Sequence, residues 1–218
     1  MKIVFCIPGK QFSGEFLDCW NELLFYCIRN GIQVIVNRKY SCNIYYVRNM
    51  LLGADVSRGK NQKPFDGKID YDFLCWIDSD TLFTTAQFQR LLNHNVDMVS
   101  ALQSFEGGNG YTCGKLDEEY FKANGYMEYF TNETIKSAER NEQGLIEADY
   151  TGFGFTLIKK GVVEAMEYPY FRPEWFEIGE CKDFCMEDVG FCMNVKKADF
   201  KIMIDPEVRV GHLKTAIF

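Results

Sequence analysis

The sequence lacks a long apolar run, and this absence excludes a membrane-spanning helix, which needs about 20 consecutive apolar residues. The start of the chain, MKIVFCIPGKQ, has one lysine and a short apolar stretch, but neither the length nor the small-residue cleavage site of a signal peptide. We therefore interpret this stretch as a first strand and expect no stable membrane span.

Positive charge is also in short supply, because 24 Lys and Arg residues stand against 31 Asp and Glu, for a formal net charge of −7. Nucleic-acid binding depends on clustered Lys and Arg side chains that contact phosphates, so we expect no nucleic-acid partner. An acidic chain that handles a polyanionic ligand requires a metal ion or a few local basic residues.

Histidine is rarer still, with two residues, His94 and His212, and the nine cysteines include no CxxC pair. A zinc site built from Cys and His therefore has little support. The odd cysteine count argues against a disulfide framework. Buried free thiols in a reducing compartment fit better, so we expect a cytoplasmic location.

The chain does contain enough apolar material for one domain, since 47% of its 218 residues are hydrophobic and 25% are charged. Strand and helix patterns alternate through its first half. Short apolar runs predict strands at residues 2–7, 32–36, 72–77 and 96–101, and apolar spacings of three and four predict helices at residues 16–28, 42–56 and 84–94. This rhythm predicts an α/β fold with a parallel sheet and helices on both faces.

The second half is less regular. Residues 103–149 are polar, Gly-rich and aromatic, and long excursions of this kind usually serve a ligand. The elements expected here are helical pieces at 116–124 and 133–139, a strand at 153–160, a helix at 161–166, a second variable loop at 167–185 and a helix at 186–200. Sugars pack on aromatic platforms, but ordinary packing is the commoner role of loop aromatics. The candidates are Tyr111, Tyr120, Phe121, Tyr126, Tyr129, Phe130, Trp175 and Phe176.

Two aspartates one residue apart, Asp78 and Asp80, close a buried-looking strand in the sequence CWIDSDTLF. Side chains two apart on an extended strand point the same way, and two carboxylates about 6–7 Å apart repel unless a cation lies near both. Carboxylates suit Mg²⁺ or Mn²⁺, which in turn hold a diphosphate. Spacing alone leaves a pair of solvated turn aspartates as an equal alternative. Ligands of parallel α/β sheets bind beyond the carboxyl ends of the strands, and Pro8, Asp78 and Asp80 all lie at such ends of the predicted sheet. We therefore favour a ligand-binding site over solvated turn aspartates.

Four further residues carry candidate chemistry. Glu187 and Asp188 begin a predicted helix, where acids are favoured by a few tenths to ~1 kcal/mol, so a structural role is slightly favoured over that of a general base. A lone histidine such as His212 is more often structural, but a neutral imidazole could complete the coordination of a metal held by Asp80. Arg48 could offer its guanidinium to a diphosphate, although a solvent-facing arginine is commoner.

Taken in order, these motifs resemble those of GT-A glycosyltransferases, in particular the family 2 type and the small glycosyltransferases of large algal viruses and phages. The resemblance covers residues 2–212 and rests on WIDSD, TGFGFTLIKKGV and MEDVGFCMNVKKADFKIMIDPEVRVGH. It implies a single GT-A domain over residues 1–218, with a nucleotide-sugar-binding half at about 1–102 and an acceptor-binding, catalytic half at about 103–218. A viral protein of this kind would act in the host cytoplasm.

The resemblance also implies roles for individual residues. Asp80 would coordinate a divalent metal, usually Mn²⁺, with His212 as a further ligand, while Asp78 would contact the donor sugar or reach the metal through water. Asp188 would be the general base, with Glu187 beside it. The other implied residues are Pro8, Arg48 and Ser79 in the nucleotide pocket and Gly152, Phe153, Gly154 and Trp175 in the sugar and acceptor pocket.

The activity implied is metal-dependent transfer of a sugar, with inversion, from a nucleotide-diphosphate sugar, UDP favoured, to a hydroxyl of a glycan or glycoconjugate. The stretch PGKQFSGEF departs from the family's pattern, so base-reading residues cannot be carried over. One alternative is a haloacid-dehalogenase-like Mg-dependent phosphatase with Asp78 as nucleophile, although Leu82 stands where that family has Thr or Val. Another is a non-catalytic carbohydrate-binding module, which would not need both the DxD sequence and the acidic pair.

Overall fold

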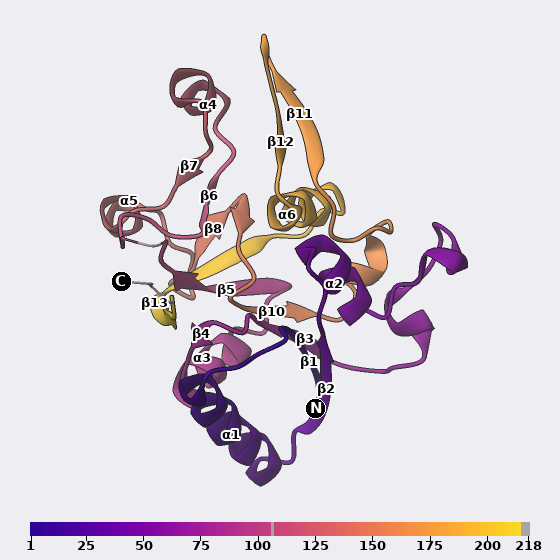
Figure 1. Ribbon diagram of the computed structural model, residues 1–218. Helices are drawn as coiled ribbons and strands as arrows, with labels where there is room; N and C mark the ends of the chain where they lie inside the picture. Colours follow the sequence, from indigo (N-terminus) through magenta and orange to yellow (C-terminus); the bar gives the residue numbers. More distant parts are fainter. Residues whose placement is uncertain (106, 215–218) are drawn as a thin grey trace.

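A central mixed sheet of eight strands organises the computed structural model, which describes residues 1–105 and 107–214 (Figure 1). The order across the sheet is β2 (Gln33–Lys39), β1 (Lys2–Pro8), β3 (Phe73–Ile77), β10 (Phe155–Lys159), β5 (Met98–Gln103), β13 (Ile202–His212) and β4 (Thr81–Leu82), with β8 (Ile146–Ala148) paired to β13. The strands predicted from the alternating pattern in the first half are thereby confirmed.

The longer strands of the sheet are mostly parallel, as predicted, whereas β10 and the short strands β4 and β8 run antiparallel to their neighbours. β1 pairs in parallel with β2 and with β3, and β5 pairs in parallel with β13. β10 lies antiparallel between β3 and β5. The carboxyl ends of β1, β2 and β3 therefore meet at one edge, where an open α/β sheet binds ligands.

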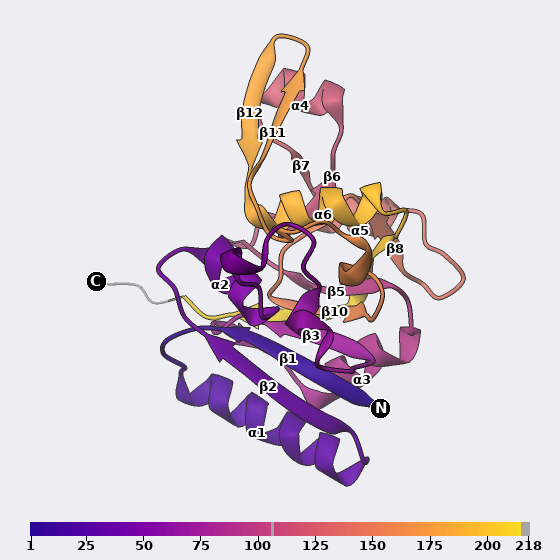
Figure 2. The same cartoon turned by 90° about the vertical axis from the view of Figure 1, so that its right-hand side faces the viewer.

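Helices cover both faces of the sheet and create two apolar layers (Figure 2). One layer joins α1 (Gly14–Arg29) and α3 (Thr85–His94) to the sheet, and the other joins α2 (Ile44–Leu51) and α6 (Glu187–Lys197). Alternate residues of β1 serve the two layers: Ile3 and Phe5 face α1 and α3, while Val4 and Cys6 face α2 and α6. Within the described residues, no helix is both long enough and apolar enough to span a bilayer.

The two stretches expected to be irregular contain more structure than their sequences indicate. The first has α4 (Glu118–Asn124), α5 (Asn132–Ser137) and a small sheet of β6 (Cys113–Lys115), β7 (Glu128–Tyr129) and β9 (Tyr150–Thr151). The variable loop predicted at 167–185 is wrong in its second part, which forms the hairpin of β11 (Glu174–Ile178) and β12 (Cys181–Cys185). The helix predicted at 161–166 is also wrong, because this short stretch makes a single 3₁₀ turn, Val163–Ala165.

A bulge interrupts β13 before it reaches the site edge. Asp205 pairs with Ala101 of β5, and the next paired residue of β13, Arg209, pairs with Leu102. Four residues of β13 therefore correspond to one residue of β5. The buried Asp205 carboxylate accepts a hydrogen bond from Arg90 Nε at 2.6 Å and lies 2.7 Å from His94 Nε2, both on α3. Burial raises the pKa of Asp205, but these hydrogen bonds outweigh burial and hold the pKa below its ordinary value. The bulge is therefore anchored to α3.

Candidate active site

The DxD sequence forms the turn between β3 and β4. The Thr81 N–H donates to the Asp78 carbonyl at 3.1 Å, and the Asp78 N–H donates to the Gly154 carbonyl, also at 3.1 Å. A Cβ built on Gly9 would lie 2.7 Å from the Cβ of Ser79, so only glycine allows the end of β1 to approach this closely. The backbone of the turn is thus held from two sides, by the segment before β10 and by the segment after β1.

Asp80 and His212, far apart in sequence, meet beside this turn. β4 pairs with the end of β13, which sets His212 opposite Thr81 and leaves its Nε2 3.2 Å from Asp80 Oδ2. The other ring nitrogen, Nδ1, lies 2.8 Å from the Ser104 carbonyl, which fixes it as a donor. If the ring is neutral, its Nε2 is an acceptor that faces a carboxylate oxygen, and two such atoms need a cation beside them. Lys214 Nζ supplies one, 2.9 Å from the same Oδ2.

Asp78 points the other way and binds Arg48. The Arg48 Nη1 and Nη2 atoms donate to the two carboxylate oxygens of Asp78, each at 3.1 Å, in a bidentate pair. The third donor, Nε, lies 3.2 Å from a carboxylate oxygen of Glu187. Arg48 therefore links the DxD turn to the first turn of α6.

The environment of Arg48 is closed. The residue is 4% exposed, and its guanidinium lies over the rings of Phe153 at 5.1 Å, Trp76 at 5.7 Å and Phe171 at 5.8 Å. Burial lowers the pKa of Arg48, but the Asp78 and Glu187 carboxylates outweigh that effect and raise it. A permanent buried cation is thereby stabilised between two acidic groups.

Asp188 follows Glu187 in the first turn of α6 and is half-buried. Its Oδ1 accepts a hydrogen bond from the Val189 N–H at 2.8 Å. Burial and the adjacent Glu187 carboxylate raise the pKa of Asp188 to about 6, against the opposing effects of the Val189 N–H and Arg48. Such a group is ionised at neutral pH yet basic enough to take a proton from a hydroxyl.

A cavity of about 270 Å³ opens at the carboxyl ends of β1, β2 and β3. The side chains around it are apolar on one side and polar on the other; they are Pro8, Gly9, Tyr40, Ser41, Ile44, Val47, Asp78, Ser79 and Asp80. The predicted residues Pro8, Asp78, Ser79 and Asp80 are thus gathered at one cavity. Arg48 lies behind the cavity and contacts it through Asp78, so its predicted contact with a nucleotide stays a prediction.

The other predicted pocket residues lie under or beyond this cavity. Phe153 is buried between Trp76 and the α6 layer. A Cβ on Gly154 would overlap the Gln103 side chain, and a Cβ on Gly152 would lie 3.0 Å from Thr112 Oγ1. Trp175 is exposed on the β11–β12 hairpin. The glycines and Phe153 therefore shape the backbone that supports the DxD turn, while Trp175 belongs to a separate surface.

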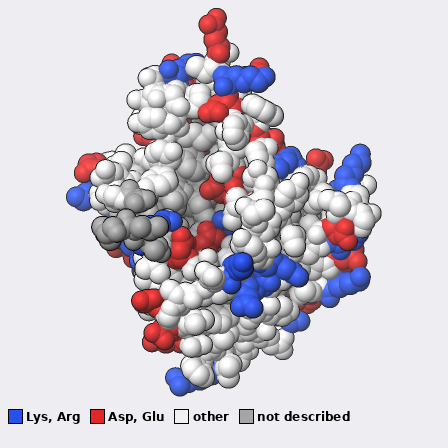
Figure 3. All heavy atoms as spheres, in the orientation of Figure 1, with Lys and Arg blue, Asp and Glu red and all other residues white. Residues whose placement is uncertain are grey.

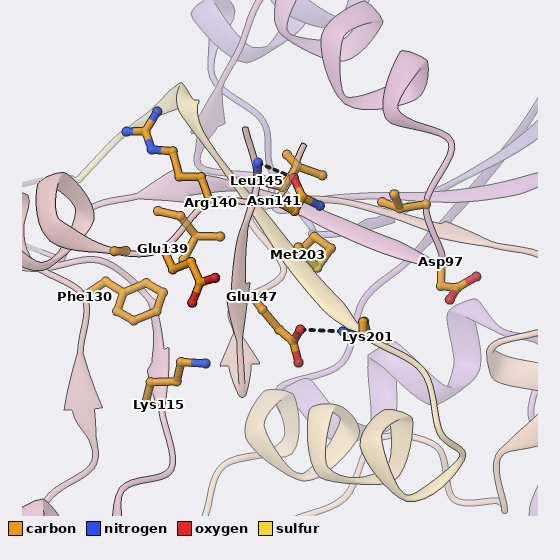
Figure 4. Close-up of a pocket in the computed structure, with 13 residues that line it drawn as sticks. Asp97, Lys115, Phe130, Glu139, Arg140, Asn141, Leu145, Glu147, Lys201 and Met203 are labelled. Atoms are coloured by element: carbon orange, nitrogen blue, oxygen red, sulfur yellow. Dashed lines mark hydrogen bonds and ion pairs between the residues drawn. The ribbon is translucent and has the colours of Figure 1, made fainter. Parts of the chain in front are cut away.

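A larger hollow, of about 690 Å³, lies next to the amino ends of β5 and β13 (Figure 4). Phe130, Leu145 and Met203 contribute apolar surface, and charged side chains surround them. One pair of these, Lys201 and Glu147, forms an ion pair at 2.9 Å. Apart from the loop aromatic Phe130, none of the predicted site residues is among the described residues that line this hollow, so its size alone does not make it the active site.

The residues at the DxD turn fit a divalent cation that is shared with a ligand. The described part of the chain contains no group of three or more His, Cys, Asp or Glu side chains placed to hold a metal. Asp80 and His212 nevertheless converge, with the Lys214 ammonium on the Asp80 oxygen that a metal would use. Mg²⁺ and similar ions are commonly held by one or two protein ligands, with substrate phosphates and water completing the shell.

Charges of both signs border this region of the surface. Figure 3 shows Asp and Glu atoms along a hollow in the middle of one face, and a group of Lys and Arg atoms beside it, over β1 and β2. The exposed residues Lys10, Arg38 and Lys39 lie at the carboxyl ends of these strands. Local basic side chains are what the acidic chain needs to attract an anionic ligand.

Sequence reasoning did not identify three features of the site. The link from Arg48 to Glu187 joins residues 139 positions apart, and no local pattern reveals such a pair. Lys214 lies outside any motif, but a basic residue two positions after the candidate ligand His212 could have indicated that it contacts the site. Tyr40, Ser41 and Ile44 of the cavity follow β2, and their place at a strand end could have marked them.

No protein family model matches the chain, and no curated protein matches it in sequence. Its fold does match solved structures. A197 from STIV aligns with a TM-score of 0.58 at 18% identity, over 99% of this chain and 87% of that one. GalNAc-T7 with UDP, GalNAc and Mn²⁺ aligns with a TM-score of 0.57 at 11% identity, and the catalytic domain of Drosophila beta1,4galactosyltransferase 7 in complex with xylobiose with 0.51 at 10%.

These alignments extend over nearly the whole chain. Each of the two transferases matches over 98% of this chain, which spans 44% of the GalNAc-T7 chain and 71% of the Drosophila chain. The mixed central sheet and the helices on its two faces agree with that architecture. The chain therefore has the GT-A fold that glycosyltransferases use.

Proposed function

We propose that the protein is a metal-dependent glycosyltransferase that moves a sugar from a nucleotide-diphosphate sugar to a hydroxyl of a glycan or glycoconjugate. The observation that carries this proposal is the convergence of Asp80 and His212 beside a cavity at the carboxyl edge of the sheet. The GT-A fold gives the same edge the role of a donor site. Residues 1–102 would supply most of this donor half and residues 103–218 the acceptor half.

Asp80 and His212 would hold the metal, Mn²⁺ or Mg²⁺, whose positive charge stabilises the departing diphosphate. Lys214 lies where it can move from Asp80 to a phosphate oxygen once a divalent ion binds. Asp78, kept in place by the bidentate bond from Arg48, presents its carboxylate edge to the cavity and would accept hydrogen bonds from hydroxyls of the donor.

The nucleotide would occupy the cavity between Pro8 and Tyr40. Its apolar side, which includes Ile44 and Val47, suits a flat base, and the Lys10 ammonium, 5.6 Å from the centre of the Tyr40 ring, favours a polyanion. UDP is the favoured nucleotide, supported by the GalNAc-T7 structure, which contains UDP and Mn²⁺.

Asp188 would remove the proton from the acceptor hydroxyl as that oxygen attacks the anomeric carbon. A pKa of about 6 suits this step, because the carboxylate is the main form at pH 7. One base and a direct attack predict inversion at the anomeric carbon. Glu187 is held by Arg48, so its role would be to raise the basicity of Asp188 and to orient the helix start.

The test is to incubate the protein with Mn²⁺ and a panel of UDP- and GDP-sugars and to measure nucleotide release and sugar transfer. Proton NMR of the product anomer decides between inversion and retention. Phosphatase activity that is abolished by Asp78→Asn, without donor binding, would instead establish the phosphatase alternative. Glycan binding with no donor binding and no turnover would establish a carbohydrate-binding module.

A further inference from the structure

A second cleft lies beside the start of α6. Two projections that rise from the sheet form its walls (Figure 1). One projection contains α4 and β7, and the other is the hairpin of β11 and β12. The space between them measures about 190 Å³ and is lined from both sides, by Tyr126 and Tyr129 on one and by Phe176 and Phe184 on the other. The two projections touch where Phe121 of α4 and Phe176 of β11 meet edge to face at 5.0 Å.

The walls of this cleft expose aromatic rings to solvent. Tyr126 is 47% exposed, Phe184 49% and Tyr129 37%. The Tyr126 and Tyr129 rings are stacked, 5.9 Å apart with an interplanar angle of 17°. Large rings exposed together on one surface usually mark a binding site.

The rings are also held in place before any ligand arrives. Phe105 supports Tyr129 edge-on at 4.7 Å, and Tyr120 supports Tyr126 edge-on at 5.7 Å, with a hydrogen bond from its hydroxyl to that of Tyr126. A preordered aromatic surface loses little conformational entropy on binding. Trp175 lies outside the cleft, next to it: its ring is 5.6 Å from that of Phe184.

The cleft adjoins the proposed general base. Met186 and Val189, which stand on either side of the Glu187–Asp188 pair, are among the residues that line it. Tyr150 lines it as well, and burial together with nearby charges, that of Asp188 included, raises the pKa of Tyr150. A molecule in this cleft therefore lies next to the start of α6.

The charge of the cleft restricts its ligand. Among the described residues that line it, Asp183 is the one charged side chain and no Lys or Arg occurs. An anionic ligand would find no counter-charge here, whereas hydroxyl groups can donate to the carboxylates of Asp183 and Asp188. Sugars combine such hydroxyls with apolar C–H faces that pack on aromatic rings.

We propose that this aromatic cleft, lined by Tyr126, Tyr129 and Phe184, binds the acceptor, and that the acceptor is a neutral oligosaccharide. The inference rests on the proposed function and adds the class of acceptor to it. One or more sugar rings pack on the paired tyrosines, and the terminal hydroxyl extends toward Asp188.

Ligand-observed saturation-transfer NMR on the full chain tests this inference without any donor present. The probes are cellotetraose, xylotetraose, maltotetraose and chitotetraose as neutral glycans, tetragalacturonate as an acidic one, and a decapeptide of Gly, Ser and Thr. We expect at least one neutral glycan to bind. Tyr126→Ala with Tyr129→Ala should weaken its binding about tenfold or more, while Tyr126→Phe with Tyr129→Phe, which keeps both rings, should retain it.

Phe25→Ala is the matched control, because Phe25 is similarly exposed, at 60%, but lies on α1. Binding that is unchanged in the double alanine variant, or that is confined to tetragalacturonate or the peptide, overturns the inference.

Titration with Mn²⁺ and UDP separates this inference from the proposed function. A protein that binds Mn²⁺ and UDP but none of the neutral glycans keeps the proposed function and loses this acceptor site. A protein that binds glycans but not Mn²⁺ and UDP loses the proposed function.

Discussion

Replacing Arg48 with methionine should destabilise the fold strongly, although the two side chains have similar length. The change removes one cation and three hydrogen bonds and leaves Asp78 and Glu187, whose side chains are 24% and 5% exposed, without a partner. Loss of one member of a buried ion pair costs about 3–5 kcal/mol. For a chain of this size that loss corresponds to a fall in Tm of roughly 6–20 °C. Urea unfolding and calorimetry measure both quantities.

Arg140→Met is the matched control, because Arg140 pairs with Glu207 at the same distance of 3.1 Å but on the surface. Its loss should cost less than about 1 kcal/mol. Adding Glu187→Met to Arg48→Met should recover part of the stability, since it removes one of the two uncompensated carboxylates. Equal effects of Arg48→Met and Arg140→Met would refute the reasoning, because the buried cluster would then be no more costly to break than an exposed pair.

The remaining predictions concern catalysis and metal binding. Asp188→Asn should lower sugar transfer by about 10²–10⁴-fold and leave Mn²⁺ and UDP binding, measured by calorimetry, intact; lost UDP binding would instead assign Asp188 to the donor site. Because the raised pKa of Asp188, about 6, makes the carboxylate the active form above that pH, kcat/KM should fall about tenfold per unit below pH 6 and stay flat above it. Arg48→Met should move this midpoint upward, since the Arg48 charge opposes the rise in the pKa of Asp188. Lys214→Ala should increase Mn²⁺ affinity in the absence of nucleotide by up to about fivefold, measured by electron paramagnetic resonance; an unchanged affinity, as expected for the surface control Lys201→Ala, would remove Lys214 from the site.

Local patterns were enough to predict most of the first half of the fold, although the helix expected at 42–56 ends at Leu51. Each strand there is a short apolar run, and its helices show the three-and-four spacing that Phe16, Leu23 and Cys27 now satisfy in the core. The position of β10 could not be obtained in this way. Its apolar sequence fits either direction between β3 and β5, and pairing across about 80 residues is decided by the packing of the whole sheet.

The hairpin was missed because its strands are weakly patterned. In EWFEI and CKDFC, exposed side chains such as Trp175 and Phe184 share one face, so the apolar side does not indicate a core. For the site, the sequence placed Pro8, Asp78 and Asp80 at strand ends, and the structure gathers them at one cavity. It could not show that the two aspartates turn apart, one toward Arg48 and the other toward His212, because long-range partners decide their directions.

Because the bulge in β13 is anchored at Asp205, the position of His212 depends on the number of residues between the two. Because side chains alternate along a strand, adding or removing one residue between Asp205 and Arg209 would turn His212 to the opposite face and shift it by about 3.3 Å. Asp205 is the fixed point of this segment, because Arg90 and His94 hold its carboxylate. The chain can therefore tolerate length changes in its loops far more readily than within this strand, where a single insertion distant from Asp80 would separate the two predicted metal ligands.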